Sequence, residues 1–147
     1  MTDEIFALDS NVLVYAYDES EPKKREQAKN LLARCWKTET KLALSTQNLS
    51  EFYWVVSRKA KPPLSNLLAK EIILSILNFE NFIKIGMNAG TVVRAIDISE
   101  KSGVMFWDAL LAATMEENGI FRIYTENIKD FSRIEGIKAV NPFKTFI

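Results

Sequence analysis

The chain has 147 residues, and 48% of them are hydrophobic, so it is long and apolar enough to bury one continuous core. Its 19 Lys and Arg residues balance 19 Asp and Glu residues, which excludes a global basic field for attracting nucleic acid. It contains no histidine, which excludes His-dependent triads, histidine as a general acid or base, and zinc sites with His ligands.

The first half of the chain predicts helices that alternate with short strands. Short apolar runs are typical of buried strands, and apolar residues spaced three or four apart indicate helices. In chain order we predict a strand over residues 5–8, a short helix over 12–17, a helix over 23–37, a strand over 41–44, and a helix that follows Ser45 and runs to about Ala60. Pro62-Pro63 cannot continue that last helix and therefore ends it.

The second half of the chain continues this alternation. We predict a helix over residues 66–78, a strand over 82–85, helices over 89–102 and 106–118, and strands over 121–124 and 138–140. Gly103 and Gly119 are typical left-handed caps after the two later helices. Strands alternating with helices predict an α/β fold with a mostly parallel sheet, in which sites form at the carboxyl ends of the strands.

Two acidic residues fall near the ends of the first two predicted strands. Asp9 directly follows the first strand, and Asn11 is placed to orient Asp9 or a metal-bound water. A simple helix cap is the competing interpretation of Asp9. Glu51 lies in the helix after the second strand, where its aromatic neighbours Phe52-Tyr53-Trp54 indicate a position at the boundary of the core.

Asp108 lies in the first turn of the helix predicted over residues 106–118. The residues three, four and seven positions later are Leu111, Ala112 and Met115, so the carboxylate begins the apolar face of the helix. A carboxylate at such a position is costly unless it is paired, hydrogen-bonded or bound to a metal. An acid that only stabilises the helix N-terminus is an equally good explanation.

A group of polar residues follows the fourth predicted strand at the same edge, namely Thr125, Glu126, Asn127 and Asp130. A solvated turn is the competing interpretation, and we prefer it for Glu126. Clustered carboxylates raise one another's pKa, so a site of this kind needs a cation. Oxygen ligands without His or Cys pairs select Mg²⁺ or Mn²⁺, which activate water and neutralise charge on a phosphodiester.

With these acids in this order, the chain resembles the PIN-domain family, and especially the toxin nucleases of VapBC toxin–antitoxin pairs. The matching segments are residues 8–13, 50–52, 106–113, 125–131 and 141–143. The resemblance covers essentially all of residues 1–147. It implies one PIN-like domain with a three-layer α/β/α fold, in which a central, mostly parallel sheet has about five strands. It also implies cleavage of RNA that depends on Mg²⁺ or Mn²⁺.

The resemblance assigns site residues one by one. Asp9, Glu51 and Asp108 match the three core acids of the family. Asp9 and Asp108 are expected to be the firmest metal ligands, and Glu51 a ligand or the general base for the attacking water.

The fourth acid departs from the commonest pattern of the family. Many relatives carry Asp two residues after the Thr, where this chain has Asn127. Others have Asn there and Asp three residues later, so we assign the fourth catalytic and metal-binding position to Asp130, with Asn127 as a neutral ligand. Thr125 is expected to hydrogen-bond the cluster or a phosphate. The departure puts a second metal ion in question more than the first.

The resemblance also implies partners. They are a homodimer mate and an antitoxin that occupies a hydrophobic groove and blocks the acids. Phe52-Tyr53-Trp54 would line such a groove, although core packing explains these side chains equally well. Basic clusters at Lys23-Lys24-Arg25 and at residues 58–61 could meet RNA, with Arg58 and Lys61 as weak substrate-binding candidates; solvated helix ends explain both clusters as well.

Two other functions stay open. One is a non-catalytic PIN-like module that binds RNA or protein, which the Asn at position 127 keeps in view. The other is a Mg²⁺-dependent phosphohydrolase, which Asp9-Ser10-Asn11 disfavours because it lacks the second Asp of an Asp-x-Asp motif.

Features of the whole chain indicate the cellular location. Cys35 is the one cysteine, which excludes an intrachain disulfide and favours a reducing compartment. Residues 1–4 lack the basic start of a signal peptide, and no apolar stretch is long enough to span a bilayer. We therefore expect a cytoplasmic protein without a membrane partner.

Overall fold

A computed structural model describes residues 4–144 of the chain. Within these residues, one sheet has the strand order β3-β2-β1-β4-β5, and every neighbouring pair of strands is parallel. The strands are β1 (Phe6–Leu8), β2 (Leu42–Ser45), β3 (Phe82–Ile85), β4 (Arg122–Tyr124) and β5 (Lys138–Val140). The prediction of an α/β fold with a mostly parallel sheet is confirmed.

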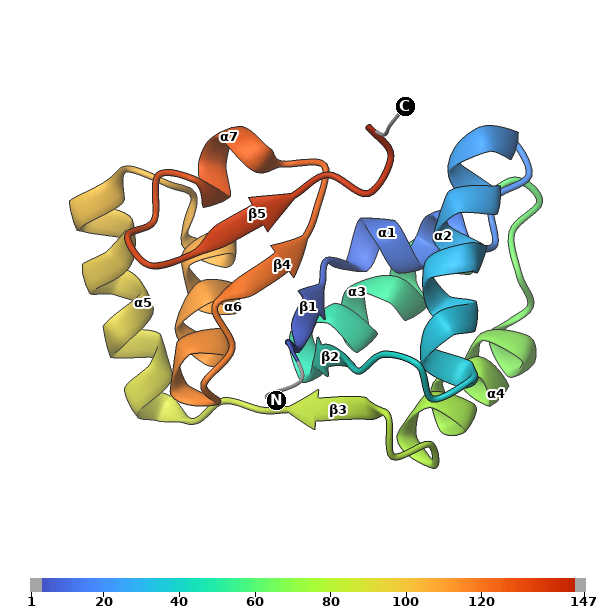
Figure 1. Ribbon diagram of the computed structural model, residues 1–147, viewed down its shortest axis with the longest axis horizontal. Helices are drawn as coiled ribbons and strands as arrows, with labels where there is room; N and C mark the ends of the chain where they lie inside the picture. Colours follow the sequence, from blue (N-terminus) through green and yellow to red (C-terminus); the bar gives the residue numbers. More distant parts are fainter. Residues whose placement is uncertain (1–3, 145–147) are drawn as a thin grey trace.

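Helices cover both faces of this sheet (Figure 1). In chain order they are α1 (Ser10–Tyr15), α2 (Pro22–Trp36), α3 (Thr46–Val56), α4 (Asn66–Leu77), α5 (Ala89–Ser102), α6 (Phe106–Glu117) and α7 (Ile128–Phe131). Helices α1 to α4 lie on one side of the strands, and α5 to α7 lie on the other. The expected three-layer α/β/α arrangement is confirmed.

The two helical layers exist because both faces of each central strand are apolar. Successive side chains of a strand point to opposite faces. Ala7 and Ile123 therefore belong to the core beneath α5, α6 and α7, whereas Leu8, Leu42 and Leu44 belong to the core beneath α1 to α4. A sheet buried on both faces holds its strand ends in fixed positions, which is what a site at the sheet edge requires.

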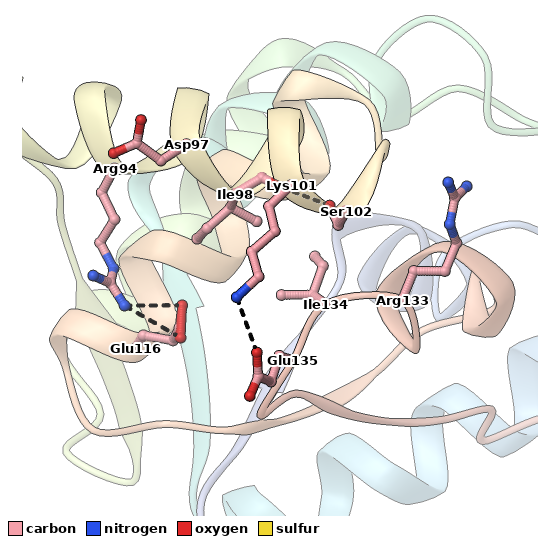
Figure 2. Close-up of a pocket in the computed structure, with 9 residues that line it drawn as sticks. All are labelled: Arg94, Asp97, Ile98, Lys101, Ser102, Glu116, Arg133, Ile134 and Glu135. Atoms are coloured by element: carbon pink, nitrogen blue, oxygen red, sulfur yellow. Dashed lines mark hydrogen bonds and ion pairs between the residues drawn. The ribbon is translucent and has the colours of Figure 1, made fainter.

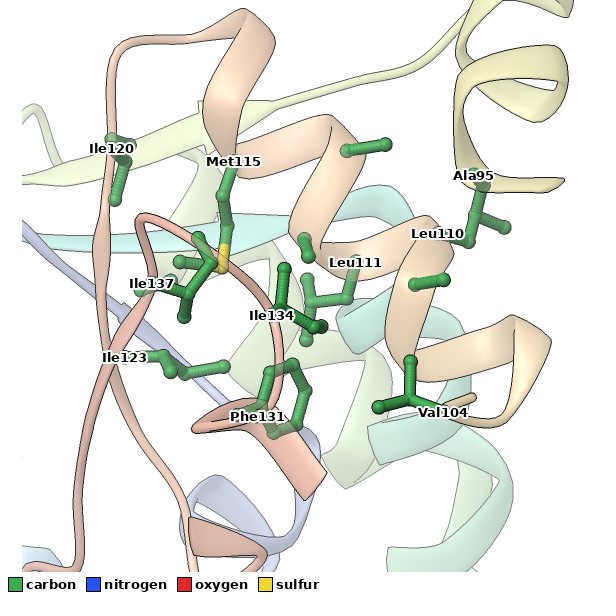
Figure 3. Close-up of a cluster of buried hydrophobic side chains, with 14 of the residues drawn as sticks. Ala95, Val104, Leu110, Leu111, Met115, Ile120, Ile123, Phe131, Ile134 and Ile137 are labelled. Carbon is green, nitrogen blue, oxygen red and sulfur yellow. The ribbon is translucent and has the colours of Figure 1, made fainter. Parts of the chain in front are cut away.

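Helix α6 lies at the centre of the core formed between the sheet and helices α5 to α7 (Figure 3). Seven consecutive residues, Ala109 to Met115, are buried, and Ile123, Phe131 and Ile134 pack in the same cluster. A helix that is apolar all round is stable only inside the molecule. Its burial anchors the residue that precedes this run, Asp108, against the sheet.

Two predicted boundaries were wrong. Helix α3 ends at Val56 rather than near Ala60, because the amides of Lys59 and Ala60 both turn back to the carbonyl of Val55. The segment expected as a loop after β4 forms the short helix α7, since Phe131 enters the core completely. The burial of Phe131 is a tertiary contact, which local sequence signals do not report.

Local caps behave as predicted. Gly103 has φ 76° and Gly119 has φ 72°, the left-handed backbone that only glycine adopts without strain. Ser45 caps α3: its hydroxyl accepts from the amide of Asn48 at 3.0 Å, and the Asn48 side chain accepts from the amide of Ser45 at 3.3 Å. This reciprocal pair fixes the turn that links β2 to the helix carrying Glu51.

None of the helices within residues 4–144 combines the length and the apolar character that crossing a bilayer requires. The expectation that the chain has no signal peptide was based on residues 1–4. Of these, residues 1–3 lie outside the described residues.

Replacement of the buried cap should show how firmly α3 is held. We expect Ser45→Ala to lower the free energy of unfolding by about 2 kcal/mol, because it removes the cap bond and leaves the buried backbone amide of Asn48 without its acceptor. Ser65→Ala, at the exposed cap of α4, is the matched control and should cost about 1 kcal/mol or less. Urea denaturation measures both values. Equal losses in the two variants would contradict the special role of the buried cap.

Candidate active site

The acids predicted from the sequence gather at the carboxyl edge of the sheet. Strands β2, β1 and β4 are neighbours and run parallel, so their carboxyl ends meet at one edge. Asp9 follows β1 directly, Thr125 follows β4, and Glu51 comes from the helix after β2. Asp108 comes from the first turn of α6, below the same edge. Segments distant in sequence thus contribute to one region.

Asp9 is held mainly by Thr125. The Thr125 hydroxyl donates to Asp9 Oδ2 at 2.7 Å and accepts from the amide of Asn127 at 2.9 Å. The side chain of Thr125 is fully buried, so this chain of bonds is shielded from water. Burial raises the pKa of Asp9, while the bonds from Thr125 and Ser10 lower it and the charge of Glu126 raises it further.

Ser10 lies between two carboxylates. Its hydroxyl is 3.1 Å from Glu51 Oε1 and 3.4 Å from Asp9 Oδ1. Burial raises the pKa of Glu51, the bond from Ser10 lowers it, and the charge of Asp9 raises it. Ser10 was not among the predicted site residues; its place between two candidates, the acid Asp9 and the amide Asn11, was the signal that it could belong to the site.

Asp108 has the most strongly raised pKa of the clustered acids. The Asn127 side chain donates to Asp108 Oδ2 at 3.0 Å. Burial is the first cause that raises the pKa of Asp108 to about 6; the charges of Asp9, Asp130 and Glu51 add to it, and the Asn127 bond opposes it. Because all three other acids act on this one carboxylate, the structure brings the four predicted acids into one electrostatic neighbourhood.

Asp130 belongs to this neighbourhood only at its margin. Its carboxylate faces Arg133 of the following turn, at 3.9 Å from Nη1. Asn127 is the residue of the two that contacts Asp108 directly. The choice between Asn127 and Asp130 for the fourth position therefore stays a prediction.

Three other predicted residues lie outside the hydrogen-bonded cluster. Asn11 is exposed, and its side chain makes no hydrogen bond within residues 4–144, so its orienting role stays a prediction. Lys61 is exposed at its side chain, and its backbone joins the turn at Asp18. Arg58 lies against the ring of Trp54. Neither basic residue contacts an acid of the cluster.

Glu126 is anchored rather than free in a solvated turn, which corrects the sequence interpretation. Its carboxylate accepts from Tyr15 at 2.7 Å and from Lys24 at 2.6 Å. These bonds connect the loop after β4 to α1 and α2. The charge of Lys24, the central residue of the cluster Lys23-Lys24-Arg25, is thus neutralised by Glu126, and the pair stabilises the fold.

The acids present suit a hard divalent cation by their chemistry. All the available ligand atoms are oxygens, which Mg²⁺ and Mn²⁺ prefer. Within the described part of the chain, no three His, Cys, Asp or Glu side chains lie close enough together to hold one ion in common. Mg²⁺ usually keeps several waters and binds through one or two carboxylates together with substrate phosphates, so it does not require a group of three. The assignment of Asp9 and Asp108 as its ligands stays a prediction.

A separate hollow in the surface lies away from this cluster. A cavity of about 490 Å³ is lined by residues of α5, α6 and the segment after α7 (Figure 2). Its walls carry the ion pairs Arg94–Glu116 and Lys101–Glu135. No acid of the strand-edge cluster lines it. We base the candidate site on the cluster, because coupled carboxylates identify chemistry more specifically than an open hollow with paired charges.

Comparisons with known proteins agree with this geometry. A sequence model of the PIN domain family matches residues 6–137. Comparison of the sequence with curated proteins gave no match. A solved structure of VapBC2 from Rickettsia felis, bound to a DNA fragment from its promoter, is similar with 25% identity and a TM-score of 0.64, covering 93% of this chain and 98% of that chain.

Two further structures share the fold. The Mycobacterium tuberculosis toxin VapC20, described as cleaving the sarcin–ricin loop, is similar with 17% identity and a TM-score of 0.65, covering 88% of this chain and 94% of that one. A toxin–antitoxin complex from Klebsiella pneumoniae has 19% identity and a TM-score of 0.61, covering 95% and 99%.

The raised pKa of Asp108 predicts a pH-dependent stability. Between its usual value of 3.8 and about 6, the folded chain binds more protons than the unfolded chain, so the free energy of unfolding falls as the pH rises through this window. Without divalent metal at pH 7.5, Asp108→Asn should therefore be more stable than the wild type by about 1 kcal/mol, after allowance for solvent screening, or about 3 °C in Tm.

Thermal denaturation with a chelator present, at pH 7.5 and at about pH 4, measures this difference. The advantage of Asp108→Asn should shrink at the lower pH, where the carboxyl of the folded wild type is protonated and no longer places a charge in the cluster. Asp97→Asn, at an exposed position of α5, is the control and should show no such advantage. A variant less stable than the wild type at pH 7.5 would contradict the argument.

Proposed function

The chain belongs to the PIN domain family, and from this premise we propose that it is a metal-dependent endoribonuclease, the toxin of a VapBC-type toxin–antitoxin pair. The observation that carries the proposal is the convergence on Asp108: the charges of Asp9, Glu51 and Asp130 all act on this half-buried carboxylate. Like charges concentrated at one strand edge lower the stability of the fold, so they are not expected in an α/β domain that has no site there.

The proposed roles follow from the contacts. Asp9 and Asp108 would hold Mg²⁺ or Mn²⁺, with Asp130 and Asn127 completing its surroundings. When bound, the ion supplies Lewis-acid stabilisation of the phosphodiester and lowers the pKa of water. Thr125 and Asn127 each donate one hydrogen bond, to Asp9 and Asp108 respectively, and so orient the two carboxylates while leaving their other lone pairs available.

Glu51 is the proposed general base. Its pKa is raised by burial, and a carboxylate with a raised pKa accepts a proton from water more readily. The bond from Ser10 fixes its direction toward Asp9. The proton of the attacking water would pass to Glu51 as the new P–O bond forms, and the leaving oxygen would depart on the opposite side.

The partners and location are part of the same proposal. The similar structures from Rickettsia felis and Klebsiella pneumoniae are toxin–antitoxin complexes or VapBC pairs, which supports an antitoxin as the partner of this chain. We extend the proposal to a single PIN-like domain over residues 1–147, to a homodimer, and to the cytoplasm.

One observation favours a second candidate, a non-catalytic PIN-like module that binds RNA or protein. Asn127 takes a position that many relatives fill with Asp, and no three described acids meet within the range of one ion. A module of this kind would bind RNA or its protein partner without turnover, so cleavage assays separate it from the nuclease.

Replacement of Asp9 tests the nuclease. We expect Asp9→Asn to reduce RNA cleavage at least about 100-fold, because a charged ligand to the ion is worth several kcal/mol in the transition state. The rise in Tm that Mn²⁺ gives the wild type should also be lost, a readout that does not depend on activity. Asp97→Asn should keep both properties. Undiminished cleavage by Asp9→Asn would refute the assignment.

A further inference from the structure

The exposed side of α3 carries a row of residues that starts at the acidic cluster. Gln47, Glu51, Trp54 and Arg58 are spaced by four, three and four positions, which places them along one face of a helix and its last turn. The Gln47 side chain donates to the carbonyl of Trp107 at 3.2 Å, next to Asp108. The row therefore begins beside the proposed metal ligands and leads away from them.

The far end of the row is an aromatic–cation stack. The guanidinium of Arg58 lies 3.6 Å from the centre of the Trp54 ring. Trp54 is nevertheless 55% exposed, so a large part of its surface is open to a ligand. Burying so large an aromatic residue normally stabilises a protein, and a tryptophan left exposed beside a catalytic cluster is available for binding.

Arg58 retains an unneutralised charge. Its Nη1 donates to the hydroxyl of Ser57 at 2.9 Å. No carboxylate among residues 4–144 lies within ion-pair distance of this guanidinium. A planar cation kept flat by a ring can stack on a further ring and can contact a phosphate at the same time.

From this arrangement we propose that Trp54 and Arg58 form a stacking platform for an unpaired nucleotide next to the scissile phosphate. This inference rests on the proposed function. A base would stack on the open surface of the Trp54 ring, and Arg58 would contact the adjoining phosphate. In a duplex the base faces are already stacked on their neighbours, so the platform has nothing to bind there.

The surroundings of Trp54 favour RNA over a protein partner. The exposed residues three or four positions from it along the helix and its last turn are Ser50, Glu51 and Arg58, all of them polar. Protein interfaces surround an aromatic anchor with further apolar area, whereas single-stranded nucleic acid is held by an aromatic ring together with cations. The combination at Trp54 and Arg58 matches the second pattern.

The test measures binding apart from cleavage. In an Asp9→Asn background, the affinity for a labelled oligoadenylate of about 10 nucleotides is measured by fluorescence anisotropy. Trp54→Ala should weaken binding about tenfold, and Trp54→Phe should retain most of the affinity. Arg58→Gln should weaken binding and reduce the slope of log Kd against log salt by about 1, because one phosphate contact is lost. Binding of the matching oligoadenylate–oligouridylate duplex should be unaffected by Trp54→Ala.

Phe121→Ala is the matched control, since Phe121 is an exposed aromatic residue that precedes β4, at the opposite edge of the sheet from the acids. Unchanged oligoadenylate affinity in Trp54→Ala, or an equal loss for the duplex, would overturn the inference. Loss of a dimer in Trp54→Ala with intact RNA affinity would overturn it in favour of a protein interface. Failure of the wild type to cleave any RNA would instead refute the nuclease, whatever the binding results.

Discussion

The hydrogen bond from Thr125 to Asp9 is the constraint on which the candidate site depends. It joins the carboxyl ends of β4 and β1 and sets one carboxylate in a region that burial and neighbouring acids make unfavourable for charge. Ser10 and Asn127 give comparable support to Glu51 and Asp108. Asp9, Glu51 and Asp108 thus each have a fixed donor, and these donors stand on segments whose positions the parallel sheet determines. Such donors limit the repulsion between the carboxylates without removing it, and the remaining repulsion would favour binding of a cation.

The sequence predicted most of the fold because its signals are local. Apolar runs identified the five strands, and Ser45, Gly103 and Gly119 marked helix ends through caps that involve only neighbouring residues. Strand order was beyond this reasoning, since pairing of β1 with both β2 and β4 depends on contacts distant in sequence. The helix α7 was missed for the same reason, because the burial of Phe131 depends on distant segments. The end of α3 at Val56 instead follows a local backbone turn around the carbonyl of Val55.

The candidate site was predictable in its residue types but not in its connections. Asp9 and Asp108 could be recognised because one follows a strand and the other begins an apolar helix face. Thr125 was the one donor expected from the sequence, and the other two could not be assigned because the pairing of Asn127 with Asp108 and of Ser10 with Glu51 bridges separate segments. The stack of Arg58 on Trp54 was also missed, because Trp54 was interpreted as a groove or core residue and Arg58 as part of a basic cluster.

The anchoring of Glu126 by Lys24 and Tyr15 has a consequence for how the loop after β4 tolerates change. Thr125 and Asn127 turn toward the acids, and the residue between them turns the opposite way, to α1 and α2. Inserting or deleting one residue here would exchange the two sides: a fifth negative charge would enter the cluster, and Lys24 would lose its partner. Surface loops generally accept length variation. In this loop, however, side chains alternate in direction along the chain, so a change of one residue would alter which of them face the acids.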